Sequence, residues 1–193
     1  TGTTILAQNH FLNIGSNSQL TSTGTAPLVQ LTDSPLTIEG TVTFTPSEGS
    51  PITSKFGNFL TVCCNNASVS LAVPLLLADP SPLTVAGSLV SISNGGQLIS
   101  TTTNPLITLT GGTHAIGSAT VGGIGSLLDL RGLTMSPDTG LGTDQVLQTG
   151  GTIFETTNGA TVNLSGTGNA VRVDTALLVA SAPIIKLINS TLN

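Results

Sequence analysis

The sequence has very few charged and aromatic residues. Only 7% of its 193 residues are charged, four residues are basic, and Trp and Tyr are absent. A nucleic-acid-binding domain needs a basic surface to neutralise phosphates, and it commonly stacks bases on aromatic rings. The composition therefore excludes nucleic acid as a partner. Because a soluble monomer usually keeps a charged surface, we expect part of this surface to be covered by copies of the chain or by other material.

Long apolar segments are also missing. The longest apolar runs, such as AVPLLLA at 72–78, are far shorter than the roughly 20 residues of a membrane-spanning helix, so we predict no membrane span. No charged segment followed by an apolar one comes after Thr1, and Thr, Ser, Asn and Gly fill the polar positions. This composition is typical of secreted β-proteins, so we expect an extracellular or cell-surface location.

Candidate catalytic residues are few and scattered. A polysaccharide lyase or hydrolase would cluster several carboxylates with basic residues on one face, often around Ca²⁺. Here Arg131 and Arg172 each lie two residues from an aspartate, Asp129 and Asp174, with which we expect them to pair. The sequence therefore predicts no catalytic residue, no metal site and no cofactor, and a protein that is not an enzyme.

The histidines and cysteines do not form a recognisable site either. His10 and His114 have no third ligand or nucleophile near them in the sequence, and we expect each to be a lone polar residue at a corner. Cys63 and Cys64 are adjacent and are the only two cysteines. They could form a disulfide with each other, form disulfides between subunits, or remain reduced. In an exported protein we expect an oxidised state, and the sequence does not choose between the first two.

A 78-residue repeat organises the chain. QLTSTGTAPLVQLT at 19–32 aligns without a gap with QLISTTTNPLITLT at 97–110, and APIIKLINSTLN at 182–193 resembles NPLITLTGGTHA at 104–115. We therefore expect one domain over 1–193. It contains a partial copy over about 1–25, full copies over 26–103 and 104–181, and a partial copy over 182–193.

A shorter internal similarity lies within the long repeat. PLVQLTDSPLTIEG at 27–40 resembles PLLLADPSPLTVAG at 74–87, and SPITS at 50–54 lies between them. Candidate strand starts then fall near 27, 51, 74, 105, 129, 152 and 183, which predicts about seven turns. The two longest departures from the repeat, 44–60 and 134–150, are expected at corresponding places in the two long units.

The repeat length and the strand pattern indicate the fold. The apolar runs are short, rich in Val, Ile, Leu and Thr, and bounded by Gly, Pro, Asn and Ser, which is typical of strands and corners. The units are too short for a propeller blade of about 40 residues, and no helical stripe is present. We predict an all-β fold, a single-coil parallel β-helix (β-solenoid) with an aliphatic interior, right-handed because parallel crossovers are.

In this pattern of short strands and Gly- and Asn-rich corners, the sequence resembles the right-handed parallel β-helices of secreted adhesins. These include autotransporter passengers and filamentous-haemagglutinin-type repeats. The resemblance covers most of the chain and concerns its pattern, without a signature motif. It implies that the chain could be the stalk or passenger segment of an exported adhesin.

The repeat pattern reaches both ends of the sequence, and no capping segment is visible there. Open ends of a solenoid expose unpaired strand edges, so we predict a head-to-tail homo-oligomer that forms an extracellular filament, sheath or surface layer. Alternatives are the adhesin stalk and an ice-binding or polysaccharide-binding solenoid, with surface polysaccharide as a further candidate partner. The residues expected to form the assembly ends are Ile5, Leu6, Phe11, Leu12, Ile14, Pro183, Ile184, Ile185, Leu187 and Leu192.

Overall fold

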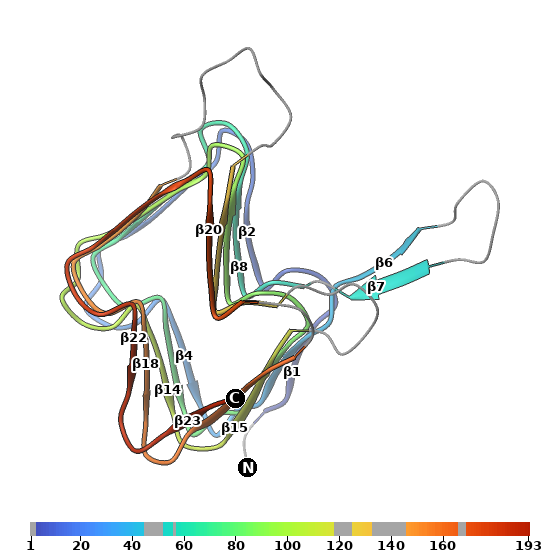
Figure 1. The fold of residues 1–193 in the computed structure, drawn as a ribbon, viewed down its shortest axis with the longest axis vertical. Helices are drawn as coiled ribbons and strands as arrows, with labels where there is room; N and C mark the ends of the chain where they lie inside the picture. Colours follow the sequence, from blue (N-terminus) through green and yellow to red (C-terminus); the bar gives the residue numbers. More distant parts are fainter. Residues whose placement is uncertain (1–2, 45–51, 56, 118–124, 133–145, 166–168) are drawn as a thin grey trace.

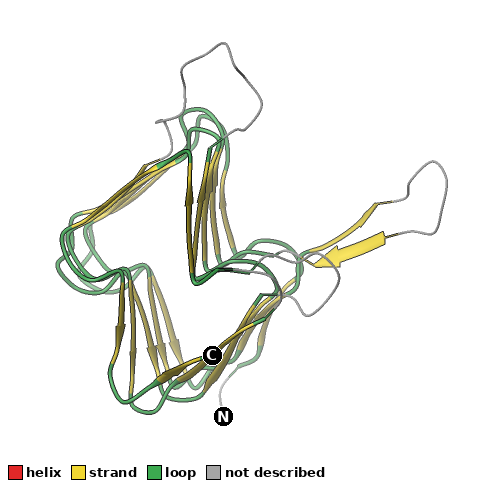
Figure 2. Cartoon of the chain, in the orientation of Figure 1, coloured by secondary structure: helices red, strands yellow, loops and turns green. Residues whose placement is uncertain are grey.

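The structure is a computed structural model that describes residues 3–44, 52–55, 57–117, 125–132, 146–165 and 169–193. Within these residues the chain forms short strands and no helix, and it winds as a single coil through four parallel sheets (Figures 1 and 2). The chain runs counterclockwise as it comes towards the viewer of Figure 1, so the coil is right-handed. The predicted parallel β-solenoid is confirmed.

Each full turn contributes one strand to each of the four sheets, which we call A to D. Sheet A contains β1 (Ile5–Ala7), β5 (Leu36–Ile38), β11 (Leu83–Val85), β15 (Thr113–Ile116), β19 (Thr161–Leu164) and β23 (Thr191–Leu192). Sheet B contains β2 (Leu12–Ile14), β8 (Leu60–Cys63), β12 (Val90–Ser93), β16 (Leu128–Arg131) and β20 (Val171–Asp174). Sheet C contains β3 (Gln19–Ser22), β9 (Ser68–Leu71), β13 (Gln97–Ser100), β17 (Val146–Thr149) and β21 (Leu177–Ala180). Sheet D contains β4 (Val29–Thr32), β10 (Leu76–Asp79), β14 (Ile107–Thr110), β18 (Phe154–Thr157) and β22 (Ile185–Leu187).

Sheet D shows how long each turn is. The residues at one position on its successive strands are Val29, Leu76, Ile107, Phe154 and Ile185. Longer and shorter turns alternate along this row, so the long repeat of the sequence spans two turns rather than three. With six strands in sheet A and five in each other sheet, the coil has slightly more than five turns. The prediction of about seven turns is therefore wrong.

The extra predicted turns came from strand-like sequence that does not begin a turn. The offset between the similar segments 27–40 and 74–87 is one whole longer turn, which SPITS at 50–54 does not divide. SPITS instead overlaps β7 (Ile52–Lys55), which pairs antiparallel with β6 (Thr41–Phe44). This hairpin projects from the corner between sheets A and B (Figure 2). The candidate start near 129 lies in β16, a strand of sheet B.

The two longest departures from the repeat lie at different corners, so their predicted correspondence is also wrong. The segment 44–60 follows β5 of sheet A and runs from the end of β6 through β7 to the first residue of β8 in sheet B, and its residues 45–51 and 56 lie outside the described residues. The segment 134–150 leads from β16 of sheet B into β17 of sheet C, and its part 134–145 lies outside the described residues. The numbering suggested a match because both segments fall in the longer kind of turn.

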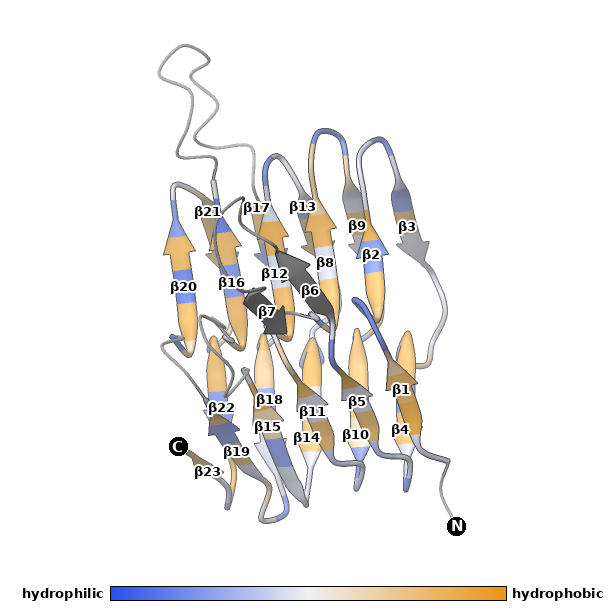
Figure 3. Ribbon diagram, turned by 90° about the vertical axis from the view of Figure 1, so that its right-hand side faces the viewer, coloured by the Kyte–Doolittle hydropathy of each residue, from blue (hydrophilic) through white to orange (hydrophobic). Residues whose placement is uncertain are grey.

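Alternate residues of each strand point into the coil. They form apolar rows that run along the coil axis from one turn of the coil, which we call a rung, to the next. Figure 3 shows this alternation along the strands of sheet B. One of its inward rows consists of Ile14, Val62, Ile92, Leu130 and Val173. The three middle members have 0% of their surface exposed. The buried core of the described chain is mostly Leu, Ile, Val and Ala, as predicted, with Phe59 and Phe154 as its aromatic members.

His114 takes an inward position on β15, in a row whose neighbouring rungs provide Leu83 and Val162. It is 0% exposed. Its Nδ1 accepts the backbone N–H of Leu83 at 3.3 Å, so Nε2 carries the proton and donates to the Gly111 carbonyl at 2.9 Å. Burial lowers the pKa of His114, and the hydrogen bond to Gly111 partly opposes this shift. The expectation that His114 lies at a corner is wrong.

Polar side chains join successive rungs at the corner between sheets A and B. The Nδ1 atom of His10 accepts the backbone N–H of Asn58 at 3.0 Å, and Oδ1 of Asn58 accepts the N–H of Ser88 at 2.7 Å. The Oγ atom of Ser88 in turn accepts the N–H of Ser126 at 3.2 Å. In each of these three bonds a side chain satisfies a backbone donor on the next rung, and we call the four residues that the bonds join the corner ladder. His10 therefore lies at a corner, as predicted, and burial lowers its pKa.

Candidate binding groove at a corner of the coil

The corner between sheets B and C is a tight turn that recurs on successive rungs. The backbone N–H groups of Ser18, Ala67 and Gly96 each bond to the carbonyl three residues earlier, at 3.0 to 3.1 Å. The turns place asparagines at positive φ, namely Asn17 at 58°, Asn66 at 61° and Asn94 at 53°. Asparagine adopts this left-handed conformation more readily than most residues, which explains why Asn recurs at these corners.

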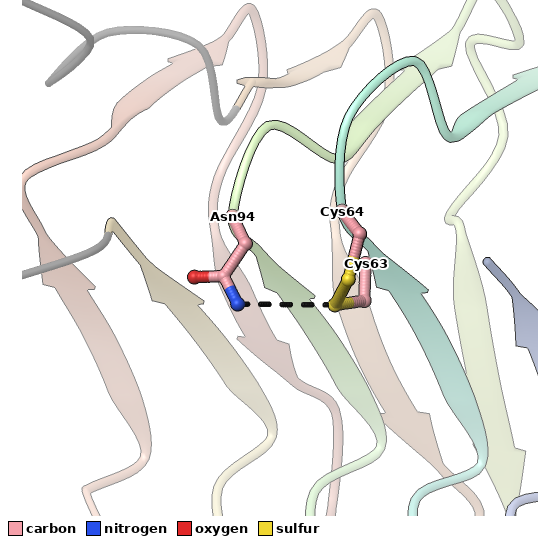
Figure 4. The surroundings of a disulfide bond; sticks show 3 residues. All are labelled: Cys63, Cys64 and Asn94. Carbon is pink, nitrogen blue, oxygen red and sulfur yellow. Dashed lines mark hydrogen bonds between the residues drawn. A yellow bond between two sulfur atoms is a disulfide. The ribbon is translucent and has the colours of Figure 1, made fainter. Parts of the chain in front are cut away.

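A disulfide bond joins Cys63 and Cys64 in one of these turns (Figure 4). Cys63 ends β8, and Cys64 opens the turn with a φ of 80°. Both residues are half-buried, and Nδ2 of Asn94 on the next rung lies 3.9 Å from Sγ of Cys63. Of the three states that the sequence left open, the structure contains the bond between the two neighbours.

A groove of about 490 Å³ opens on the outside of this corner, directly after the disulfide. Its lining carries no charge and consists of Gln19, Asn65, Asn66, Ala67, Ser68, Gly95 and Gln97. Gln19, Ser68 and Gln97 occupy the same outward position on three consecutive strands of sheet C. Asn65 and Asn66 come from the turn, which places them beside this column.

Most of the amide groups in the groove are available to a ligand. The side chains of Gln19, Asn65 and Gln97 have no hydrogen-bond partner among the described residues, whereas Nδ2 of Asn66 donates to Oδ1 of Asn17 at 3.0 Å. A side-chain amide can donate two hydrogen bonds and accept two. The groove can therefore offer both donors and acceptors without any charge.

A second hollow of about 350 Å³, lined by Ser93, Asn94, Arg131, Gly132, Arg172 and Asp174, lies beside a group of ion pairs. Arg131 pairs with Asp129 at 2.5 Å and Arg172 pairs with Asp174 at 3.2 Å, which confirms the pairing predicted from the sequence. The register places Asp129 beside Arg172 and Arg131 beside Asp174, so the four charges alternate and neutralise one another. One oxygen of the buried Asp129, Oδ1, lacks a hydrogen-bond partner. This balance makes the hollow a poor site for a charged ligand.

Other combinations of reactive residues are not brought together in the described part of the chain. Its residues contain no group of three or more His, Cys, Asp or Glu side chains that could hold a metal ion. The same described residues contain no helix long and apolar enough to cross a membrane. That the chain is not an enzyme and uses no cofactor stays a prediction.

The residues predicted to form the assembly ends lie on the first and last rungs, formed by β1–β4 and β20–β23. Most of them are partly buried against the core, namely Ile5, Phe11, Leu12, Ile14, Ile184, Ile185 and Leu192. Phe11 also stacks on Phe59 with a ring-centroid distance of 5.2 Å. Leu187 occupies an inward row but is 42% exposed, and Pro183 is exposed. Leu6 lies in the outward column of sheet A that contains Thr37 and Thr84, and it is 56% exposed.

Sequence reasoning missed the groove, because its residues come from three successive rungs of the coil and none has a charge or a reactive group. A signal was nevertheless present. Gln19 and Gln97 begin the matching strings QLTST and QLIST, which occupy the same place in two copies of the long repeat. Their equivalent places in the repeat put both amides on one outward column.

Comparison with known proteins gives no relative. No protein-family model matches the chain, and no curated protein or solved structure shows significant similarity to it. The fold and the local geometry therefore carry the functional argument.

Proposed function

We propose that the chain is a structural subunit of an extracellular filament, sheath or surface layer, in which copies stack end to end along the coil axis. In this arrangement β20, β21 and β22 on the last rung of one copy pair with β2, β3 and β4 on the first rung of the next. The contact is heterologous and leaves an open end after each addition, so it generates a fibre.

The main support comes from inward rows that continue onto the last rung. Leu109 on β14 and Leu187 on β22 occupy the same row, two rungs apart. Leu109 is 0% exposed because rungs lie on both sides of it, whereas Leu187 is 42% exposed. Val173 on β20 is likewise 44% exposed, although Leu130 before it in its row is 0% exposed. A further rung would cover these apolar side chains and pair the open strand edges.

The first rung presents a suitable partner surface. Its strands have the sequences ILA, LNI, QLTS and VQLT and contain no charged residue. Natural sheets that avoid edge-to-edge association usually place charges, prolines or bulges on their edge strands. The low charge of the whole chain, 7%, also limits electrostatic repulsion between copies.

Light scattering and electron microscopy of the purified chain test this proposal with a matched pair of variants. Leu187→Lys places a charge on an inward position of the last rung, and we expect it to abolish rods that the wild-type chain forms. Val179→Lys is the control, because Val179 lies on the same rung at 42% exposure but on the outer face of sheet C. A wild-type chain that stays monomeric at high concentration, or equal effects of both variants, would refute end-to-end stacking of copies.

The same exposed rows would also suit a longer chain whose next turn covers the last rung, as in the stalk or passenger segment of an exported adhesin. In that arrangement the next turn covers Leu187 and Val173, so copies have no uncovered last rung on which to stack, and light scattering of the longer chain would show monomers. Ice binding has less support. An outward column of sheet A runs Thr37, Thr84, Ala115 and Asn163, so threonine does not recur on every rung.

A further inference from the structure

The groove beside the disulfide has a regular wall on the side of sheet C. Gln19, Ser68 and Gln97 stand in one column on β3, β9 and β13. Neighbouring strands are about 4.8 Å apart, so the two glutamines start from positions about 10 Å apart along the coil axis. Their amides can therefore contact separate units of an extended ligand that runs along the axis.

The opposite wall is the turn that follows Cys63–Cys64. It contributes the amides of Asn65 and Asn66, both exposed. Gly95 on the next rung keeps the groove open above them, because a Cβ atom there would lie 3.3 Å from Oδ1 of Asn65. The two walls thus face a common space, which stays open because Gly95 has no side chain.

The chemistry of the walls restricts the class of ligand. The lining contains no cationic side chain that could pair with an anionic ligand and no carboxylate that could pair with a cationic one. A peptide cannot add as a strand here, because β9 is already paired with β3 and β13. Hydroxyl groups, which both donate and accept, match the free amides of Gln19, Asn65 and Gln97.

The surface next to the groove has the same neutral character. The strands of sheet C read QLTS, SVSL, QLIS, VLQT and LLVA and contain no charged residue. Beyond Gln97 the same outward column continues with Val146 and Leu177. Leu177 is 46% exposed, and such apolar side chains can contact the C–H faces of sugar rings.

From this geometry we propose that the groove binds a neutral, hydroxyl-rich saccharide chain, extended along the coil axis and hydrogen-bonded to Gln19, Asn65 and Gln97. The length of one sugar unit in an extended chain is similar to the spacing of neighbouring strands. Successive units therefore stay in register with successive rungs. Of the lining residues, only Gln19 on β3 lies on a rung that the proposed stacking uses, and its side chain points outward. The groove is complete within one copy, so saccharide binding does not depend on stacking.

Calorimetric titration with cellohexaose, xylohexaose and mannohexaose tests the proposal, with hexagalacturonate as the acidic comparison. We expect at least one neutral hexasaccharide to bind with a Kd of about 1 mM or tighter, and hexagalacturonate to bind more weakly. Gln97→Ala and Asn65→Ala should each weaken binding by about tenfold, because each removes an amide that bonds to the sugar.

Gln148→Ala is the matched control. Gln148 is an exposed amide on the same sheet, in the other outward column and outside the groove lining. We expect its removal to leave the affinity unchanged. The proposal is overturned if none of the three neutral hexasaccharides binds, if hexagalacturonate binds as tightly as they do, or if Gln148→Ala weakens binding as much as Gln97→Ala.

Discussion

At the scale of single residues, His114 places an imidazole inside a row that is otherwise aliphatic. Its Nδ1 accepts a backbone hydrogen bond, so a proton added there would face the N–H of Leu83. Burial holds the pKa of His114 below its ordinary value of 6.5. The folded chain therefore disfavours the charged form that the unfolded chain adopts readily in mild acid.

We predict that the free energy of unfolding is at its full value above about pH 6.5 and decreases as the pH falls below this value, because the unfolded chain then binds protons that the folded chain excludes. Each buried histidine contributes a slope of at most about 1.4 kcal/mol per pH unit. Urea denaturation of wild type and His114→Leu between pH 5 and 7 measures this contribution. The variant should show a smaller slope, and an unchanged slope would contradict the role assigned to His114.

The sequence did not reveal this environment. His114 follows Gly111, Gly112 and Thr113, a context that is typical of a turn. The strand register, which the sequence does not display directly, turns the side chain inward. The pairs Arg131–Asp129 and Arg172–Asp174 could be predicted, because a spacing of two residues places both partners on one face of any strand.

At the scale of strands and corners, the corner ladder shows why particular polar residues recur at one place. Ser88 is 1% exposed, and its hydroxyl accepts the backbone N–H of Ser126. Ser88→Ala should therefore leave that N–H buried without a partner and destabilise the chain by about 1–3 kcal/mol. Ser70→Ala, at an exposed outward position of β9, should change stability by less than about 0.5 kcal/mol. Thermal unfolding of both variants checks this, and equal shifts would argue against the ladder.

Close approach of the backbone at a corner gives a second prediction. A Cβ atom on Gly96 would lie 2.3 Å from the carbonyl oxygen of Val62 on the neighbouring rung, whereas one on Gly15 would meet nothing within 4 Å. Gly96→Ala should thus lower the free energy of unfolding by about 1–3 kcal/mol, because the backbone of a packed rung must move. Gly15→Ala at the same corner serves as the control. Chemical denaturation distinguishes the two variants, and an unchanged free energy of unfolding for Gly96→Ala would contradict the spacing of the rungs.

Strand and corner positions could be read from the sequence, whereas the division into turns could not. Apolar strings such as LVQL and LITL reveal strands, since each fills an inward row. The hairpin strand β7 contains similar residues but pairs antiparallel outside the coil. Hydrophobic pattern alone does not distinguish a strand of the coil from a strand of an insertion. The sequence-based prediction therefore divides the longer turn that contains β7 into two turns.

At the scale of the whole molecule, stacking of copies would continue sheets B, C and D without interruption. Each of these sheets contributes five strands per chain, whereas sheet A contributes six. If three sheets stack in register, β23 of one copy and β1 of the next reach the same level of sheet A. One of these two short strands must then leave the sheet.

The most direct test of the proposed assembly is the axial rise per subunit, measured from the power spectrum of electron micrographs of filaments. Five rungs at about 4.8 Å predict a rise of about 24 Å, together with a strong reflection near 4.8 Å along the filament axis. This result would mean that the coil continues from one copy into the next. Filaments whose 4.8 Å reflection is perpendicular to the axis, or a chain that forms only isolated short rods, would contradict end-to-end stacking.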